Sequence, residues 1–96
     1  MTRVGLMEIE LHIPSAQSLK QKRAVIKSLK DRVTAKFNVS IAEVDFTDKW
    51  QRSILALAIV SRDKTHLESQ FTQVMSFVDS ELLGSAVVLR QEMTLF

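Results

Sequence analysis

The feature that most constrains the fold is residues 53–61, SILALAIVS, which would be apolar on both faces of a β-strand. Successive side chains of a strand point to opposite faces. One face would therefore carry Leu55, Leu57 and Ile59, and the other would carry Ile54, Ala56, Ala58 and Val60. Such a strand is typical of the centre of a sheet. The run is too short for a membrane helix, which needs ~20 apolar residues.

The remaining strands are predicted on either side of this one. In residues 3–13 Met7, Ile9, Leu11 and Ile13 alternate with polar residues, and Pro14 ends the strand. Residues 39–46 form a second strand in which Ala42, Val44 and Phe46 alternate with two acids. Val39 and Ile41 are out of phase, which indicates either a bulge or two partly covered faces. Residues 47–50 read as a loop, and residues 85–95 as the last strand.

Two amphipathic helices are predicted between these strands. Residues 18–36 begin with a capping box, Ser18 and Gln21. At about 100° per residue, the apolar stripe comprises Leu19, Ile26, Leu29, Val33 and Phe37. In the second helix Asp63 is the predicted N-cap and Gly84 follows the end. Its apolar residues are Leu67, Phe71, Val74, Val78 and Leu82.

The element order is therefore strand, helix, strand, strand, helix, strand, without an internal linker. This order predicts an α+β, ferredoxin-like fold (βαββαβ) in which residues 1–96 form a single domain. We expect a four-stranded antiparallel sheet of order 4-1-3-2 with both helices on one face. The other face would stay open.

Composition narrows the classes of function. The chain has no cysteine, which excludes disulfides and thiolate chemistry and favours the cytoplasm, and its start has no signal-peptide pattern. The net charge is only +2, yet seven of the thirteen Lys and Arg residues lie in residues 18–36, whose only acid is Asp31. The molecule should therefore be electrically polarised.

Three stretches resemble the YlxP-like family of small bacterial proteins, a domain of unknown function: HIPSAQSLKQKRAVIKSL, NVSIAEVDFTDKWQR and LALAIVSRD. The resemblance covers nearly the whole chain. Its most specific parts are residues 18–23 (SLKQKR) and residues 42–45 (AEVD), followed by Asp48, Trp50 and Gln51. It implies a ferredoxin-like fold, a bacterial source and a gene among those of translation and ribosome maturation. It implies no catalytic residues.

The basic stripe of the first helix is the main candidate for a binding site. Lysine and arginine contacts to phosphate dominate nucleic-acid affinity. The alternative is a solvated helix face, although such faces normally mix both signs of charge. We expect a non-enzymatic protein that binds structured or ribosomal RNA. The RNA-binding residues would be Lys20, Lys22, Arg23, Lys27, Lys30, Lys49 and Arg52.

The open sheet face is predicted to bind a protein partner and not RNA. Its first and third strands carry no aromatic residue, and Glu8 and Glu10 would repel phosphate, so base stacking is disfavoured. Apolar residues of the third strand suggest a protein partner or a homodimer. A glutamate should pair with Arg90 across strands. No metal site is expected, because the third strand separates Glu8 and Glu10 from Glu43.

Three further expectations concern chemistry. Trp50 should fold back over the end of the core, although a loop tryptophan can also clamp a base or a partner. His66 should be a surface residue. With only Gly5 and Gly84, the chain has no phosphate-binding glycine loop and no cofactor signature. A small-molecule sensor stays open as a weaker alternative.

Overall fold

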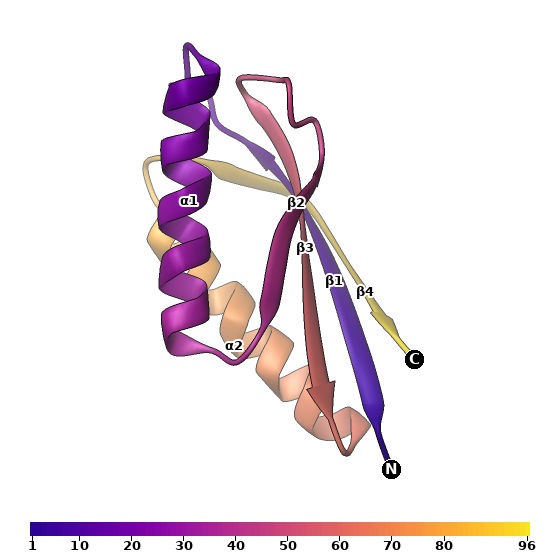
Figure 1. Cartoon of the computed structure of the whole chain (residues 1–96). Helices are drawn as coiled ribbons and strands as arrows, with labels where there is room; N and C mark the ends of the chain where they lie inside the picture. The colour runs from indigo at the N-terminus through magenta and orange to yellow at the C-terminus, as the bar shows by residue number, and fades with distance from the viewer.

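The computed structural model describes residues 1–96. Its elements follow the predicted order: β1 (Arg3–His12), α1 (Leu19–Lys36), β2 (Ser40–Asp45), β3 (Arg52–Ser61), α2 (Lys64–Leu82) and β4 (Val87–Leu95). Figure 1 shows both helices on one side of the sheet, with α1 upright beside β2 and α2 crossing behind the longer strands. The ferredoxin-like α+β fold is confirmed.

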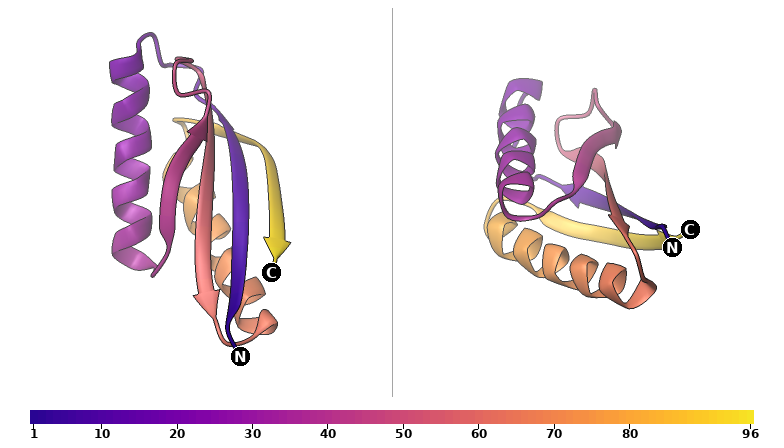
Figure 2. Two further views of the ribbon diagram at one scale, coloured as in Figure 1. Left: turned by 45° about the vertical axis from the view of Figure 1, so that its right-hand side comes forward. Right: turned by 60° about the horizontal axis from the view of Figure 1, so that its bottom comes forward.

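The four strands form one antiparallel sheet of order β2-β3-β1-β4, which is the predicted order 4-1-3-2 in reverse. β1 lies at the centre and pairs with β3 from Arg3 opposite Ser61 to His12 opposite Arg52. On its other side β1 pairs with β4. Both views of Figure 2 show a strongly twisted sheet that leaves β2 and β4 as its edges.

The core lies between the sheet and the two helices. The odd-numbered residues of β1 from Met7 to Leu11 are buried, together with Leu55, Leu57 and Ile59 of β3. α1 contributes three buried apolar side chains, and α2 contributes six, with Phe71 and Val74 at the centre. Alternation in the strands and the three-to-four-residue spacing in the helices therefore identified most of the core.

Both predicted helix starts are confirmed. The Ser18 hydroxyl accepts a hydrogen bond from the Gln21 amide at 3.0 Å, and the Gln21 side chain accepts one from the Gln17 amide at 2.7 Å. The first bond satisfies an amide hydrogen that has no partner inside the first helical turn, and the second ties the residue before the N-cap to that turn. Asp63 caps α2 in the same way through the His66 amide. Gly84, at φ +83°, follows the end of α2 as predicted.

The structure decides the orientation of β2, which the two out-of-phase apolar sets in the sequence left open. Val39 and Ile41 pack against the core, whereas Ala42 and Val44 are exposed on the open face. The register shifts between Glu43 and Asp45, so a bulge, one of the two alternatives for this strand, is present. Glu43 consequently faces the helices. The reason is tertiary, because β2 is an edge strand whose inner side meets α1.

Neither helix of the structure combines the length and the hydropathy that a membrane span would require.

Candidate nucleic-acid interface

The basic stripe of α1 is an exposed helix face, as predicted. Lys20, Arg23 and Lys27 are exposed and Lys30 is partly buried, and all four flank the side of α1 that enters the core. Arg23, Lys27 and Lys30 line a surface hollow of about 450 Å³ between α1 and Glu43 of β2. Three positive side chains therefore converge on one concave surface at the β2 edge.

The charge of this hollow is partly balanced. Lys27 forms an ion pair with Asp31 one helical turn later, with 2.7 Å between Nζ and Oδ2. The hydrogen bond that Lys27 donates to Asp31, together with the negative charge of that carboxylate, raises the pKa of Lys27. No salt bridge holds Lys20, Arg23 or Lys30. These three cations are consequently free to meet a phosphate without first giving up a partner.

Lys22 does not belong to this surface, and its assignment as an RNA-binding residue is wrong. Its side chain is only 1% exposed and lies inside the protein beside the apolar stripe of α1. The ammonium forms an ion pair with Glu43 at 2.7 Å and donates a hydrogen bond to the Phe46 carbonyl oxygen. Glu43 also accepts a hydrogen bond from the buried Ser53 hydroxyl at 2.6 Å. An ammonium buried with these partners cannot reach a phosphate in solution.

This buried network fastens the loop between β2 and β3 to the start of α1. The Lys22 ammonium donates a hydrogen bond to the Phe46 carbonyl oxygen, and the Lys49 amide donates a second hydrogen bond to the same oxygen at 3.0 Å. On the other side of the loop, the Gln51 side chain donates to the carbonyl oxygens of Pro14 and Ala16, each at 3.1 Å. Figure 1 accordingly shows the loop beside the N-terminal end of α1. Lys49 is exposed there, at the same end of the molecule as Lys20.

Trp50 does not fold over the core, so that prediction is wrong. Its side chain is 53% exposed and lines a hollow of about 500 Å³ on the loop, together with His12, Asp48, Lys49, Gln51 and Arg52. The end of the core is closed instead by Ile13 and Ala16, which are buried. The Gln51 side chain holds this segment in place through its hydrogen bonds to Pro14 and Ala16.

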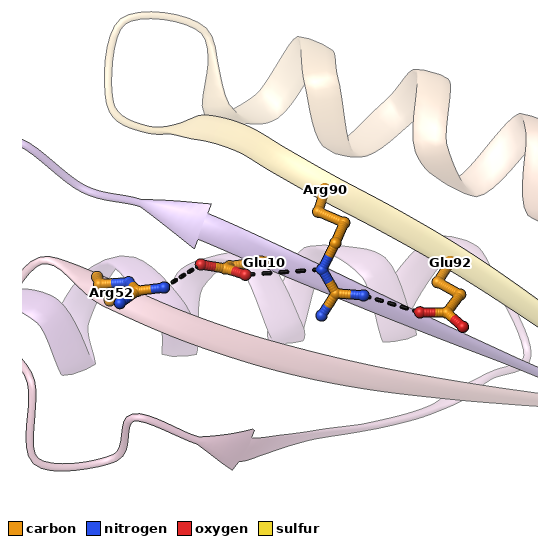
Figure 3. A network of polar contacts seen from close by, with 4 residues as sticks. All are labelled: Glu10, Arg52, Arg90 and Glu92. Atoms are coloured by element: carbon orange, nitrogen blue, oxygen red, sulfur yellow. Dashed lines mark hydrogen bonds and ion pairs between the residues drawn. The ribbon is translucent and has the colours of Figure 1, made fainter.

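Arg52 lies on the open sheet face and is already paired. It forms an ion pair with Glu10 and stacks over the Phe46 ring at 4.2 Å. Figure 3 shows Arg52, Glu10, Arg90 and Glu92 as a chain of alternating charges along the sheet. The hydrogen bond and the positive charge of Arg52, with a further contribution from Arg90, lower the pKa of Glu10. Arg52 therefore does not extend the basic surface of α1.

The predicted cross-strand pairing is confirmed, since Glu10 lies opposite Arg90 and contacts it at 3.7 Å. The strand order also separates Glu43 from the acids of β1, as expected. The other half of the open face is apolar, with Val60 69% exposed beside Val4, Leu6 and Ala58. His66 is exposed, as predicted, and its Nδ1 lies 2.8 Å from the Ser61 hydroxyl.

The buried network was missed in the sequence, although signals for it exist. Lys22 precedes Ile26, Leu29 and Val33 at spacings of four, three and four, which places it in the core stripe. Glu43 shares the phase of Val39 and Ile41 in β2. A basic and an acidic residue that both fall on apolar faces are candidates for a buried pair, because neither is tolerated there alone.

Comparison with structures of known proteins supports the fold. A cofactor-independent oxygenase from Streptomyces nogalater, SnoaB, is 18% identical with a TM-score of 0.56, over 100% of this chain and 92% of that one. The designed protein Foldit4 is 15% identical with a TM-score of 0.57, over 100% and 97%. The chlorite dismutase-like protein TA0507 has a TM-score of 0.58 at 11% identity over 97% of this chain, which spans 43% of its length. At these identities the likeness concerns the fold alone.

Sequence comparison identifies the family. Residues 4–91 match the model of a family described as "Protein of unknown function (DUF503)". The uncharacterised protein YlxP of Bacillus subtilis (strain 168) is 44% identical over 77 residues, which are 80% of this chain and 84% of YlxP. The resemblance seen in residues 18–23 and 42–51 is thereby confirmed. The chain therefore belongs to the DUF503 family and is a relative of YlxP.

Proposed function

We propose that this protein binds structured RNA, ribosomal RNA among the candidates, through the phosphate backbone. The binding surface is the basic stripe of α1, with Lys49 at its N-terminal end. The protein acts in the cytoplasm as a non-enzymatic adaptor.

The observation that carries this proposal is the convergence of Arg23, Lys27 and Lys30 on one hollow beside β2. A phosphate ribbon that follows α1 could meet these cations and Lys20 in succession. The acids Glu8, Glu10 and Glu92 lie on the other face of the sheet or at its far edge. Because Arg52 and Arg90 balance Glu10 and Glu92 on the open face, the unpaired cations of the stripe are the charges that would orient an approaching polyanion toward α1.

The direct test is RNA binding by a charge-reversed variant. In Lys20→Glu/Arg23→Glu/Lys30→Glu, each substitution replaces an exposed or partly exposed cation that makes no salt bridge. We expect the affinity for a ribosomal RNA fragment, measured by fluorescence anisotropy, to fall at least tenfold. For the wild type, the slope of log K against log salt should be roughly −2.7 to −3.6, the value for three or four phosphate contacts on a duplex.

A matched control carries the same charge change at the other end of the molecule. Arg62 and Lys64 follow β3, and Arg3 begins β1 beside them. The variant Arg3→Glu/Arg62→Glu/Lys64→Glu should keep most of the affinity. Equal losses of RNA affinity in the two variants would show that only net charge matters. Unchanged RNA binding by the stripe variant, with an intact circular dichroism spectrum, would refute the proposal.

A second candidate function is protein interaction through the open sheet face, including a face-to-face homodimer. The exposed Val60 and its neighbours Val4 and Ala58 form the apolar half of that face. Burying them against a second copy would remove apolar surface from water. The variant Val60→Glu should abolish such an interaction in sedimentation velocity, whereas the stripe variant should leave it intact.

A further inference from the structure

The edge strand β4 is long and uncovered. β2, the other edge, has six residues, contains a bulge and lies beside α1. β4 has nine residues, and no further element pairs with its outer side. Leu89 is 55% exposed and Met93 is 42% exposed along it. A free edge offers unpaired amide and carbonyl groups for another strand, and proteins normally shield such edges.

The sequence of β4, VVLRQEMTL, is chemically self-complementary in the antiparallel direction. Two copies related by a two-fold axis perpendicular to the sheet must be centred on one residue, because paired residues share a face. Centring on Gln91 places Arg90 opposite the other copy's Glu92 and Leu89 opposite Met93. The bulge at Leu89 puts Val87 and Leu95 on different faces of β4, so these two residues lie outside the regular pairing.

The two neighbouring registers, centred on Arg90 and on Glu92, are disfavoured by charge repulsion. Centring on Arg90 places two arginines directly opposite each other, and centring on Glu92 does the same with two glutamates. Like charges in directly opposed positions are destabilising, and opposite charges are stabilising. Because a one-residue shift of the centre replaces two attractive pairs by a repulsive one, charge selects the Gln91 register.

We propose that two copies of this chain pair through β4, antiparallel and centred on Gln91, to join their sheets into one of eight strands. In each chain Arg90 and Glu92 project from β4 on the open face, 2.8 Å apart at their nearest atoms (Figure 3). In the pair, each arginine gains the partner's glutamate opposite it. The four charges then alternate in sign around the axis.

The other face of β4 supplies the apolar part of this contact. Met93 lines a hollow of about 650 Å³ between β4 and α2, whose apolar lining also includes Met7, Phe71 and Met75. The register places the partner's Leu89 beside Met93 at the mouth of this hollow. β4 has a bulge at Leu89, because Arg90 pairs with Glu10 of β1 and Val88 pairs with Leu11. The regular part of β4 ends there. The regular pairing therefore spans Leu89 to Met93 of each copy.

The chain contains no cysteine, so single cysteine variants report the register directly. Gln91 would lie opposite itself, and directly paired residues have Cα atoms about 4.5–5.5 Å apart, within the range of a disulfide. We expect Gln91→Cys to form a disulfide-linked dimer on mild oxidation. The control Thr94→Cys should not, because its two copies would be roughly 20 Å apart.

A charge exchange tests the same register without cross-linking. Glu92→Arg places like charges opposite each other twice, and we expect the dimer dissociation constant in sedimentation equilibrium to rise at least tenfold. The ion pair of Glu92 is with Arg90, so this substitution leaves the Arg52–Glu10 pair in place. The double variant Arg90→Glu/Glu92→Arg reverses both members and should restore dimerisation.

Three results would overturn the proposal. The first is a wild-type protein that stays monomeric at several hundred micromolar. The second is a dimer that Val60→Cys cross-links and Gln91→Cys does not, which would assign the contact to the open face. The third is a dimer whose dissociation constant is the same in the wild type, in Glu92→Arg and in the double variant.

Discussion

At the scale of single residues, the most consequential feature is the buried ion pair between Lys22 and Glu43. Its desolvation is offset by the 2.7 Å contact between the charges and by hydrogen bonds to the Phe46 carbonyl oxygen and from the Ser53 hydroxyl. All buried side-chain polar atoms in the structure have partners. The pair ties α1 to β2, β3 and the loop, so it determines how the basic stripe and Lys49 are placed relative to each other.

The first prediction concerns this pair. Glu43→Gln leaves the Lys22 ammonium buried without a counter-charge and should lower the free energy of unfolding by about 3 kcal/mol. Replacing both residues, as in Lys22→Met/Glu43→Leu, should recover most of that loss. Urea unfolding followed by circular dichroism measures both. If the single and the double variant were equally unstable, the loss would come from packing and not from the unpaired charge.

The second prediction is a pH dependence from Glu10. Because Arg52 and Arg90 lower the pKa of Glu10 in the folded state, the ionised carboxylate stabilises the fold above its ordinary pKa. That contribution is lost as the pH falls through the lowered value. We expect the urea midpoint of Glu10→Gln to lie below that of the wild type at pH 7 and to converge with it toward pH 2. Glu8→Gln, which removes no ion pair, should keep the wild-type acid profile.

At the scale of elements, α2 packs closely on β1 at Gly5. A Cβ atom at this position would lie 2.5 Å from Cε2 of Phe71, whose ring is buried between α2 and the sheet. Glycine is therefore required here by close approach and not by a left-handed backbone. This contact sets the distance between the helix layer and the central strand.

The third prediction follows from that contact. Gly5→Ala forces the Phe71 ring or the helix to shift and should destabilise the protein by about 1–3 kcal/mol. A second substitution, Phe71→Leu, removes the clashing ring atoms, so Gly5→Ala should cost less in that background. A double-mutant cycle in urea measures the coupling between the two sites. Additive effects would show that Gly5 acts through strand propensity alone.

At the scale of the whole molecule, the two proposed surfaces lie at opposite edges of the sheet. α1 and its stripe stand beside β2, whereas the proposed dimer contact is on β4. Pairing through β4 would leave both basic stripes accessible at the outer ends of the dimer. A long RNA could then contact two stripes at once, which raises its apparent affinity without any new contact.

The fourth prediction tests this arrangement and rests on both proposals. An RNA long enough to reach both stripes should bind the wild type at least tenfold more tightly than a short hairpin does. In Glu92→Arg this ratio should fall toward one, and in Arg90→Glu/Glu92→Arg it should return. Since the short hairpin reports the direct effect of the altered charge, a ratio that stays constant across the three proteins would contradict the model.

Much of the fold was predictable because local periodicity carries it. The alternation of Met7, Ile9 and Leu11 and the helical spacing of Leu67, Phe71 and Val74 need only the geometry of one element. The candidate site was less predictable. Lys20 and Arg23 are exposed as predicted, but the predictions for Lys22, Arg52 and Trp50 depended on neighbours that are distant in sequence.

The sequence by itself therefore determined the element order, the caps at Ser18 and Asp63, and the apolar faces that build the core, because each depends on residues a few positions apart. Only the tertiary structure decided which cations remain free. Lys22 of α1 forms an ion pair with Glu43 of β2, and Arg52 of β3 forms one with Glu10 of the neighbouring strand β1. The long-range pairing of charges removes them from the surface that a phosphate could reach. The local pattern places Lys22 on the apolar stripe of its helix but does not show which residue it pairs with.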